Sequence, residues 1–151
     1  NNFENTLVVS PPFAGKTTLI RDMARALAKN YDVVIVDERG EIGGGEGSIY
    51  DLGSFVDIVG NVPKTLVTEG IIRSMSPEII VLDELSPEKD MKIVEEISRS
   101  GIKLLASVHS DSIERLTKAL PHIARHFCYG VLLSNKPSIG SIKSIVRFRG
   151  D

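Results

Sequence analysis

The chain has 151 residues, of which 42% are hydrophobic, and 18 Lys and Arg against 20 Asp and Glu leave a formal net charge of −2. A chain of this length buries roughly 70% of the surface that it exposes when unfolded, so it can hold a core without disulfides. The near-neutral charge excludes a global field that attracts nucleic acid or an anionic membrane. We therefore expect one domain over residues 1–151 and no direct nucleic-acid partner.

The cysteine count and the length of the apolar runs bear on the redox compartment and on membrane spans. Cys128 is the single cysteine, so no intramolecular disulfide can form, which fits a reducing compartment. The strongly apolar runs at 33–36 and 79–82 have four residues each, whereas a membrane-spanning helix needs about 20. Residues 1–4 read Asn-Asn-Phe-Glu, without an initiator Met or a leader pattern, and we interpret the chain as a fragment that lacks the N-terminal part of its parent.

Strand and helix patterns alternate along the chain. Short β-branched runs predict buried strands, and apolar residues at helical spacing predict amphipathic helices. The predicted strands cover residues 7–9, 33–36, 79–82, 103–108, 127–133 and 142–148. The predicted helices follow residue 15, cover 64–75, run from 87 to about 101 and cover 111–120. Six glycines between positions 40 and 53 predict a mobile loop. The alternation predicts an α/β fold with a mainly parallel sheet flanked by helices.

A phosphate-binding loop is predicted between the first strand and the first helix. Residues 10–17 read Ser-Pro-Pro-Phe-Ala-Gly-Lys-Thr and match the P-loop pattern except that Ser10 replaces its first glycine. Gly15 lets the backbone approach a phosphate, Lys16 can reach the β- and γ-phosphate oxygens, and the Thr17 hydroxyl can bind Mg²⁺. The alternative is a Pro-rich turn before an ordinary helix, but a strand before the loop and a helix after it favour the P-loop. The predicted nucleotide-binding residues are Pro12, Phe13, Ala14, Gly15, Lys16, Thr17 and Thr18.

Two adjacent carboxylates follow the apolar run at 79–82 and form a Walker B pattern. In an open α/β sheet, ligands bind beyond the carboxyl ends of the strands. Asp83 is then the predicted Mg²⁺ ligand, and Glu84 the predicted base that polarises the attacking water. The alternative is an acidic turn on the surface, and the P-loop pattern in the same chain disfavours it.

Polar residues also end the strand that follows. The run at 103–108 leads to Ser107, Val108 and His109. Strands before and after Walker B indicate the P-loop class of the RecA-like and AAA-like type, in which an added strand lies between the P-loop strand and the Walker B strand. Either Ser107 or His109 could then sense the γ-phosphate, while the plain alternative for His109 is a satisfied strand-end histidine.

Three stretches resemble the stage III sporulation protein AA family. They are residues 10–22, beginning Ser-Pro-Pro, residues 35–42, Ile-Val-Asp-Glu-Arg-Gly-Glu-Ile, and residues 72–84, ending Val-Leu-Asp-Glu. The resemblance spans residues 6–133. The family is similar to the hexameric ATPases of type II secretion and type IV pili, so their Asp box corresponds to residues 37–41 and their His box to 107–109.

The resemblance implies site residues and also marks departures from the family. It implies a catalytic role for Glu38 within the Asp box and for His109 in the His box. Phe55 stands where the family often has an arginine, and Phe13 and Ala14 replace small residues of the loop. If that arginine reaches a neighbouring subunit's nucleotide, its role here falls to Arg39, to Arg73 or to no residue.

The resemblance also implies what the chain does and where. It implies a Mg²⁺-dependent ATPase in the mother-cell cytoplasm that is active as a homo-oligomeric, hexameric ring. The ring is expected to energise membrane proteins of a channel between mother cell and forespore. Catalysis would rest on Lys16, Glu84, Glu38 and His109. Two other classes remain open: a scaffold that binds ATP without turnover, and a small-molecule or nucleotide kinase. A kinase usually needs an Arg-rich lid, and residues 40–53 contain no arginine.

Overall fold

A computed structural model describes residues 2–37, 56–60 and 70–148, and the structural statements below concern these residues. They form one seven-stranded sheet in the order β3-β2-β4-β5-β1-β6-β7. The strands are β1 (Thr6–Ser10), β2 (Val33–Asp37), β3 (Val56–Gly60), β4 (Ile79–Leu82), β5 (Lys103–His109), β6 (Tyr129–Ser134) and β7 (Ser141–Arg147). Neighbours pair in parallel from β3 to β6, and β7 alone among these strands pairs antiparallel.

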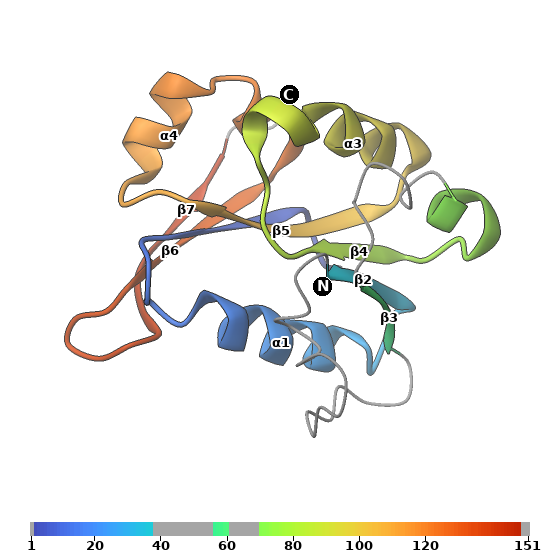
Figure 1. Ribbon diagram of the computed structural model, residues 1–151, viewed down its shortest axis with the longest axis horizontal. Coiled ribbons are helices and arrows are strands. Elements are labelled where there is room, and N and C mark those ends of the chain that lie inside the picture. Colours follow the sequence, from blue (N-terminus) through green and yellow to red (C-terminus); the bar gives the residue numbers. More distant parts are fainter. Residues whose placement is uncertain (1, 38–55, 61–69, 149–151) are drawn as a thin grey trace.

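Helices cover both faces of this sheet (Figure 1). The helix α1 (Lys16–Leu27) lies on one face, whereas α3 (Pro87–Ser100) and α4 (Ile113–Ala119) lie on the other. A 3₁₀ helix, η1 (Ile123–His126), packs beside α3, and residues 70–74 are helical. None of the described helices is long and apolar enough to cross a membrane. The result is a three-layer α/β/α arrangement.

Alternate residues of the central strands supply the two halves of the core. Val8, Ile35 and Leu105 face α1 and pack with its buried residues Ile20 and Ala24. Their chain neighbours point to the other face, toward α3 and α4. This second cluster includes Leu7, Val34, Leu104, Val94, Ile97 and Leu116. Because a strand covered on both faces is apolar at every position, the central strands read as continuous runs such as Val-Val-Ile-Val.

The predicted fold class is confirmed, including the position of the added strand. β5 lies between β1, which precedes the predicted P-loop, and β4, which precedes the predicted Walker B carboxylates. All six predicted strands are present with shifts of a few residues at their ends, and the predicted helix at 111–120 is the shorter α4. Residues 38–55 and 61–69 lie outside the described part, so the predicted loop at 40–53 and most of the helix at 64–75 stay predictions.

The sequence pattern does not predict strand β3 at residues 56–60. β3 pairs in parallel with β2 at the edge of the sheet, with Ile35 opposite Ile58 and Val36 opposite Val59. Its Val-Asp-Ile-Val run is short and follows a glycine-rich stretch, so the local pattern is weak. An edge strand of this kind is stabilised by pairing with its neighbour, which periodicity along the chain does not report.

Candidate functional site

The carboxyl ends of β1, β4 and β5 bring the predicted site residues to one edge of the sheet. The parallel register places Ser10 beside His109 and Leu82 beside Ala106. Asp83 and Glu84 therefore leave β4 next to the end of β5, and the loop that starts at Ser10 leaves β1 on its other side. The Ser110 backbone N–H donates to the Ser10 carbonyl oxygen at 3.1 Å, which binds the start of this loop to the end of β5.

The loop between β1 and α1 turns through two left-handed backbone conformations. Gly15 has φ 81° and is the N-cap of α1. Phe13 has φ 61°, a conformation that is strained for a residue with a side chain. The Phe13 side chain is 88% exposed, while Ala14 is buried. The loop thus presents its backbone at the N-terminus of a 12-residue helix, where unpaired N–H groups and the helix dipole favour an anion.

Three charged or ionisable side chains meet in front of this loop. Lys16 Nζ lies 3.8 Å from Glu84 Oε2 and 3.5 Å from His109 Nε2. His109 Nε2 lies 3.1 Å from Glu84 Oε1. The side chain of Lys16 is 12% exposed, that of Glu84 23% and that of His109 46%, so the group lies half-sheltered and open to a ligand. The sequence separation between Lys16 and His109 is 93 residues, and only the fold brings them together.

These side chains line a pocket of about 370 Å³ at the carboxyl edge of the sheet. Its lining comes from the predicted loop, the start of α1 and two strand ends. The residues are Pro11, Pro12, Phe13, Ala14, Gly15, Lys16, Thr17, Thr18, Glu84 and His109. All seven residues predicted from the P-loop pattern therefore lie on one pocket with the predicted base and the predicted sensor.

Asp83 and Ser107 lie deeper, behind this pocket. The Ser107 hydroxyl donates to the Asp83 carbonyl oxygen, and the Leu85 backbone N–H donates to the Ser107 carbonyl oxygen at 2.7 Å. Ser107 is fully buried, and these two hydrogen bonds hold the backbone on both sides of Glu84. The Glu84 N–H in turn donates to Asp83 Oδ1 at 2.8 Å. Of the two candidate sensors that the sequence left open, His109 faces the pocket, and Ser107 fixes the turn at Asp83 and Glu84.

Some predicted residues fall outside the described part of the chain, and one contact was not predicted. Glu38, Arg39 and Phe55 are not described, so their proposed roles stay predictions. The turn between β6 and β7 contacts the predicted phosphate-binding loop. A Cβ added to Gly15 would lie 3.1 Å from Gly140 Cα and 3.2 Å from Ile139 Cγ2. The sequence pattern of these residues does not indicate this contact, because Gly15 and Gly140 are far apart in the chain.

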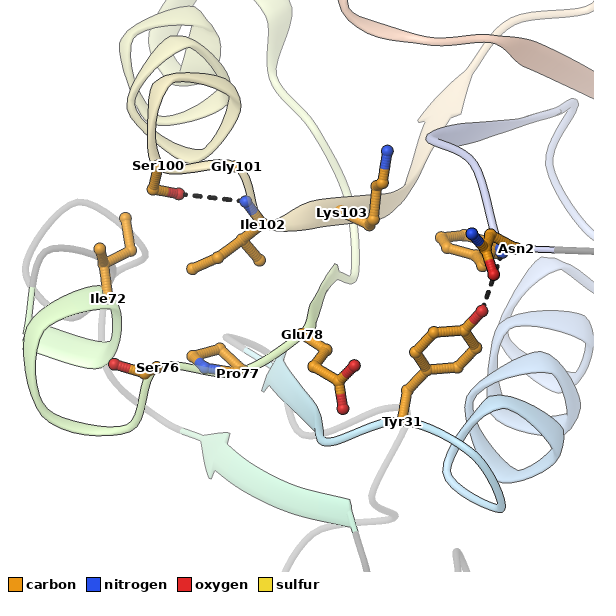
Figure 2. A pocket seen from close by; sticks show the side chains of 11 residues that line it. Asn2, Tyr31, Ile72, Ser76, Pro77, Glu78, Ser100, Gly101, Ile102 and Lys103 are labelled. Atoms are coloured by element: carbon orange, nitrogen blue, oxygen red, sulfur yellow. Dashed lines mark hydrogen bonds between the residues drawn. The ribbon is translucent and has the colours of Figure 1, made fainter.

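A larger pocket of about 570 Å³ lies at the opposite, amino edge of the sheet (Figure 2). Its lining includes Tyr31, Glu78 and Lys103, which lie within two residues of the starts of strands β2, β4 and β5. The Tyr31 hydroxyl accepts from the Phe3 backbone N–H at 3.0 Å, and the Lys103 side chain extends away from Glu78. Among the described residues, no cluster of converging polar groups comparable to Lys16, Glu84 and His109 is seen there. The smaller pocket is therefore the better candidate for a functional site.

Comparison with known proteins assigns the family. A model of the family "Sporulation stage III, protein AA" matches residues 1–151. Stage III sporulation protein AA of Bacillus subtilis is 39% identical over 126 residues, which are 78% of this chain and 41% of that protein. The protein SEEDLING PLASTID DEVELOPMENT 1 of Arabidopsis thaliana is 34% identical over 118 residues, which are 74% of this chain and 17% of that protein. The chain thus spans less than half the length of these relatives.

Solved structures share the fold at low sequence identity. The VirB11 ATPase of the Brucella suis type IV secretion system, in complex with sulphate, superposes with a TM-score of 0.72 at 15% identity. That match covers 95% of this chain and 48% of the other. The pilus retraction motor PilT with bound ADP gives a TM-score of 0.67 at 17% identity, covering 96% of this chain and 46% of the other. The fold is that of P-loop secretion ATPases, and by its sequence the chain belongs to the stage III sporulation protein AA family.

Proposed function

We propose that this chain is a Mg²⁺-dependent ATPase domain that binds ATP on the loop at 10–17 and hydrolyses its γ-phosphate. The observation that supports this most is the meeting of Lys16, Glu84 and His109 within 3.8 Å of one another at the N-terminus of α1. A cation that binds phosphate, a carboxylate that can accept a proton and a polar strand-end group are the parts that phosphoryl-transfer chemistry needs.

The loop and Lys16 bind the phosphates. The α1 N-terminus offers backbone N–H groups and the positive end of its dipole to the β-phosphate. Lys16 Nζ, now 3.8 Å from Glu84 Oε2, adds a full positive charge that is 12% exposed and so little screened by water. When a triphosphate binds, its β- and γ-oxygens compete with Glu84 for this ammonium group. The contact between Lys16 and Glu84 is then the one that the substrate replaces.

Thr17 and Asp83 would hold the metal ion. Thr17 lines the pocket, and Asp83 follows β4 in a position only 7% exposed. A hydroxyl and a carboxylate are oxygen donors of the type that Mg²⁺ prefers, and the ion keeps several water molecules in such sites. When bound, Mg²⁺ supplies charge neutralisation on the phosphate oxygens. The donor types on these two residues therefore fit the ion.

Glu84 acts as the base and His109 as its neighbour at the γ-phosphate. The Glu84 carboxylate accepts a proton from the attacking water as the water oxygen bonds to the γ-phosphorus and the bond to the ADP oxygen breaks. Ser107 fixes the backbone on both sides of Glu84, and Lys16 and His109 contact its carboxylate. His109 Nε2, 3.1 Å from Glu84 Oε1, orients this carboxylate and contacts the γ-phosphate. A carboxylate held in this way suits hydrolysis.

The wider role follows from family membership and from the names of the structural relatives. The VirB11 and PilT structures are named as an ATPase of a secretion system and a pilus retraction motor. By likeness, this chain works as the motor domain of a homo-oligomeric ring, proposed to be a hexamer, in the mother-cell cytoplasm. The ring would energise membrane proteins of a sporulation channel. Glu38 would assist catalysis, and Arg39 or Arg73 could act on a neighbouring subunit's nucleotide.

Phosphate release with Mg²⁺-ATP tests the proposal, on this chain and on a longer chain that contains it. Lys16→Ala should abolish the thermal stabilisation by Mg²⁺-ATP, whereas Glu84→Gln should keep it and lower turnover at least 100-fold, as expected for loss of a general base (about 10²–10⁴-fold). Lys29→Ala and Glu88→Gln, both at exposed positions away from the pocket, are the matched controls. Undiminished turnover by Glu84→Gln would remove its role as base.

The remaining outcome separates the enzyme from the scaffold. An arginine supplied by a neighbouring subunit can be worth about 10³–10⁵ in rate, so slow turnover by a single domain agrees with the proposal. ATP binding without turnover in the assembled longer chain would support a nucleotide-binding scaffold instead. No stabilisation by millimolar Mg²⁺-ATP would contradict nucleotide binding altogether.

A further inference from the structure

The proposed site has two ends, and the sheet order distinguishes them. Glu84 and His109 follow β4 and β5, which lie on one side of the loop strand β1. On the other side of β1 lies β6. If the γ-phosphate is at Glu84 and His109, the triphosphate runs across the N-terminus of α1, and the nucleoside leaves the site toward β6. This step rests on the proposed function.

The element on that side is the turn between β6 and β7. A Cβ built on Gly15 would lie 3.1 Å from Gly140 Cα, 3.2 Å from Gly140 N and 3.2 Å from Ile139 Cγ2. The turn therefore packs directly against the last glycine of the phosphate-binding loop. Figure 1 shows the same arrangement, with the β6–β7 turn beside the segment that leads into α1. The turn therefore borders the loop on its β6 side, next to the residues that line the pocket.

The turn presents an apolar side chain to solvent at that place. Ile139 is 70% exposed even though its Cγ2 approaches Gly15. The neighbouring polar side chain of Ser138 is engaged within the turn, since its Oγ lies 3.2 Å from Ser141 Oγ. Small-molecule sites are lined mainly by apolar side chains that cover the flat, weakly hydrated parts of a ligand. A nucleobase is such a part, and an aliphatic side chain can cover its face.

We propose that Ile139 is the platform on which the base of the bound nucleotide packs. The β6–β7 turn then has two roles: Gly140 supports the backbone of Gly15, and Ile139 binds the part of the substrate that the phosphate-binding loop does not reach. The contact is apolar, so it adds affinity for a nucleoside triphosphate and none for a bare polyphosphate. That difference makes the platform measurable apart from phosphate binding.

Titration calorimetry with two ligands tests the platform. Mg²⁺-ATP carries a base, and Mg²⁺-tripolyphosphate carries the same chain of phosphates without one. Ile139→Ala should raise the Kd for ATP about five- to tenfold. This is the affinity expected to be lost when most of the apolar area that the ligand covers is removed. The Kd for tripolyphosphate should stay within about twofold. Ile139→Leu keeps the apolar area and should bind ATP within about threefold of the wild type.

A second exposed isoleucine of the same hairpin provides the control. Ile145 is 64% exposed on β7, and Ile145→Ala should leave both Kd values unchanged. Equal losses for ATP and tripolyphosphate in Ile139→Ala would overturn the proposal, because Ile139 would then only support the phosphate-binding loop. Unchanged ATP affinity would overturn it too. If the wild type binds tripolyphosphate and ATP equally, the platform fails while phosphate binding stands; if it binds neither, the proposed function fails with it.

Discussion

Substitution of Gly15 by Ala tests how closely the β6–β7 turn packs on the phosphate-binding loop. Gly15 has φ +81°, a conformation that costs a residue with a Cβ about 1–2 kcal/mol. The added methyl would also lie 3.1 and 3.2 Å from backbone atoms of Gly140, which cannot move as freely as a side chain. Overpacking of this kind costs about 1–3 kcal/mol. Together we expect Gly15→Ala to lower the free energy of unfolding by about 2–5 kcal/mol.

Gly101 is the matched control for this substitution. It has φ +80° at the end of α3, and a Cβ built on it has no heavy atom within 4 Å. Gly101→Ala therefore carries the same conformational penalty without the crowding and should cost about 1 kcal/mol, since Ala also restricts the unfolded chain. The difference between the two variants isolates the contact with Gly140.

Urea denaturation without nucleotide measures both free energies, so the result does not depend on the proposed activity. Gly15→Ala combined with Ile139→Ala should regain less than half of the crowding term, because the removed side chain accounts for one of three close contacts. Equal stability of Gly15→Ala and Gly101→Ala would refute the packing of the turn on the loop. Full recovery in the double variant would assign the crowding to Ile139 and not to the Gly140 backbone.

Three further substitutions probe the fold and the site. Gly130→Ala places a methyl 2.7 Å from Cζ of the buried Phe148, so thermal unfolding should show a free energy of unfolding lower by about 1–3 kcal/mol. The double variant with Phe148→Leu should regain part of this loss. Ser107→Ala leaves the buried Asp83 carbonyl without its hydroxyl donor, so urea denaturation should show a loss of about 1–2 kcal/mol; an unchanged midpoint would contradict that hydrogen bond. Phe13→Gly relieves a left-handed residue whose side chain is 88% exposed and should be neutral or stabilising by up to about 1 kcal/mol, and a clear loss of stability would show that Phe13 packs.

Local pattern determined the identity of the elements and of most candidate site residues. The apolar runs at 33–36 and 79–82 predicted strands buried on both faces, and the run of residues 10–17 predicted the loop before α1. These features depend on residues close in sequence, because the residue types at adjacent positions decide whether a strand can be buried and which backbone conformations a loop can adopt. The order of motifs even predicted the added strand, since each strand end brings its own polar residues.

Tertiary structure decided which of these residues meet and what each one does. Ser107 and His109 are two residues apart, yet one is fully buried against the Asp83 carbonyl and the other lies 3.1 Å from the Glu84 carboxylate. The strand pleat points residues two apart to the same face, so only their positions along β5 against β4 and β1 give each side chain its neighbour. The pairing of edge strand β3 with β2, and the packing of Gly140 on Gly15, likewise join segments far apart in sequence. Contacts of this kind depend on the pairing of strands and leave no trace in the periodicity of either segment.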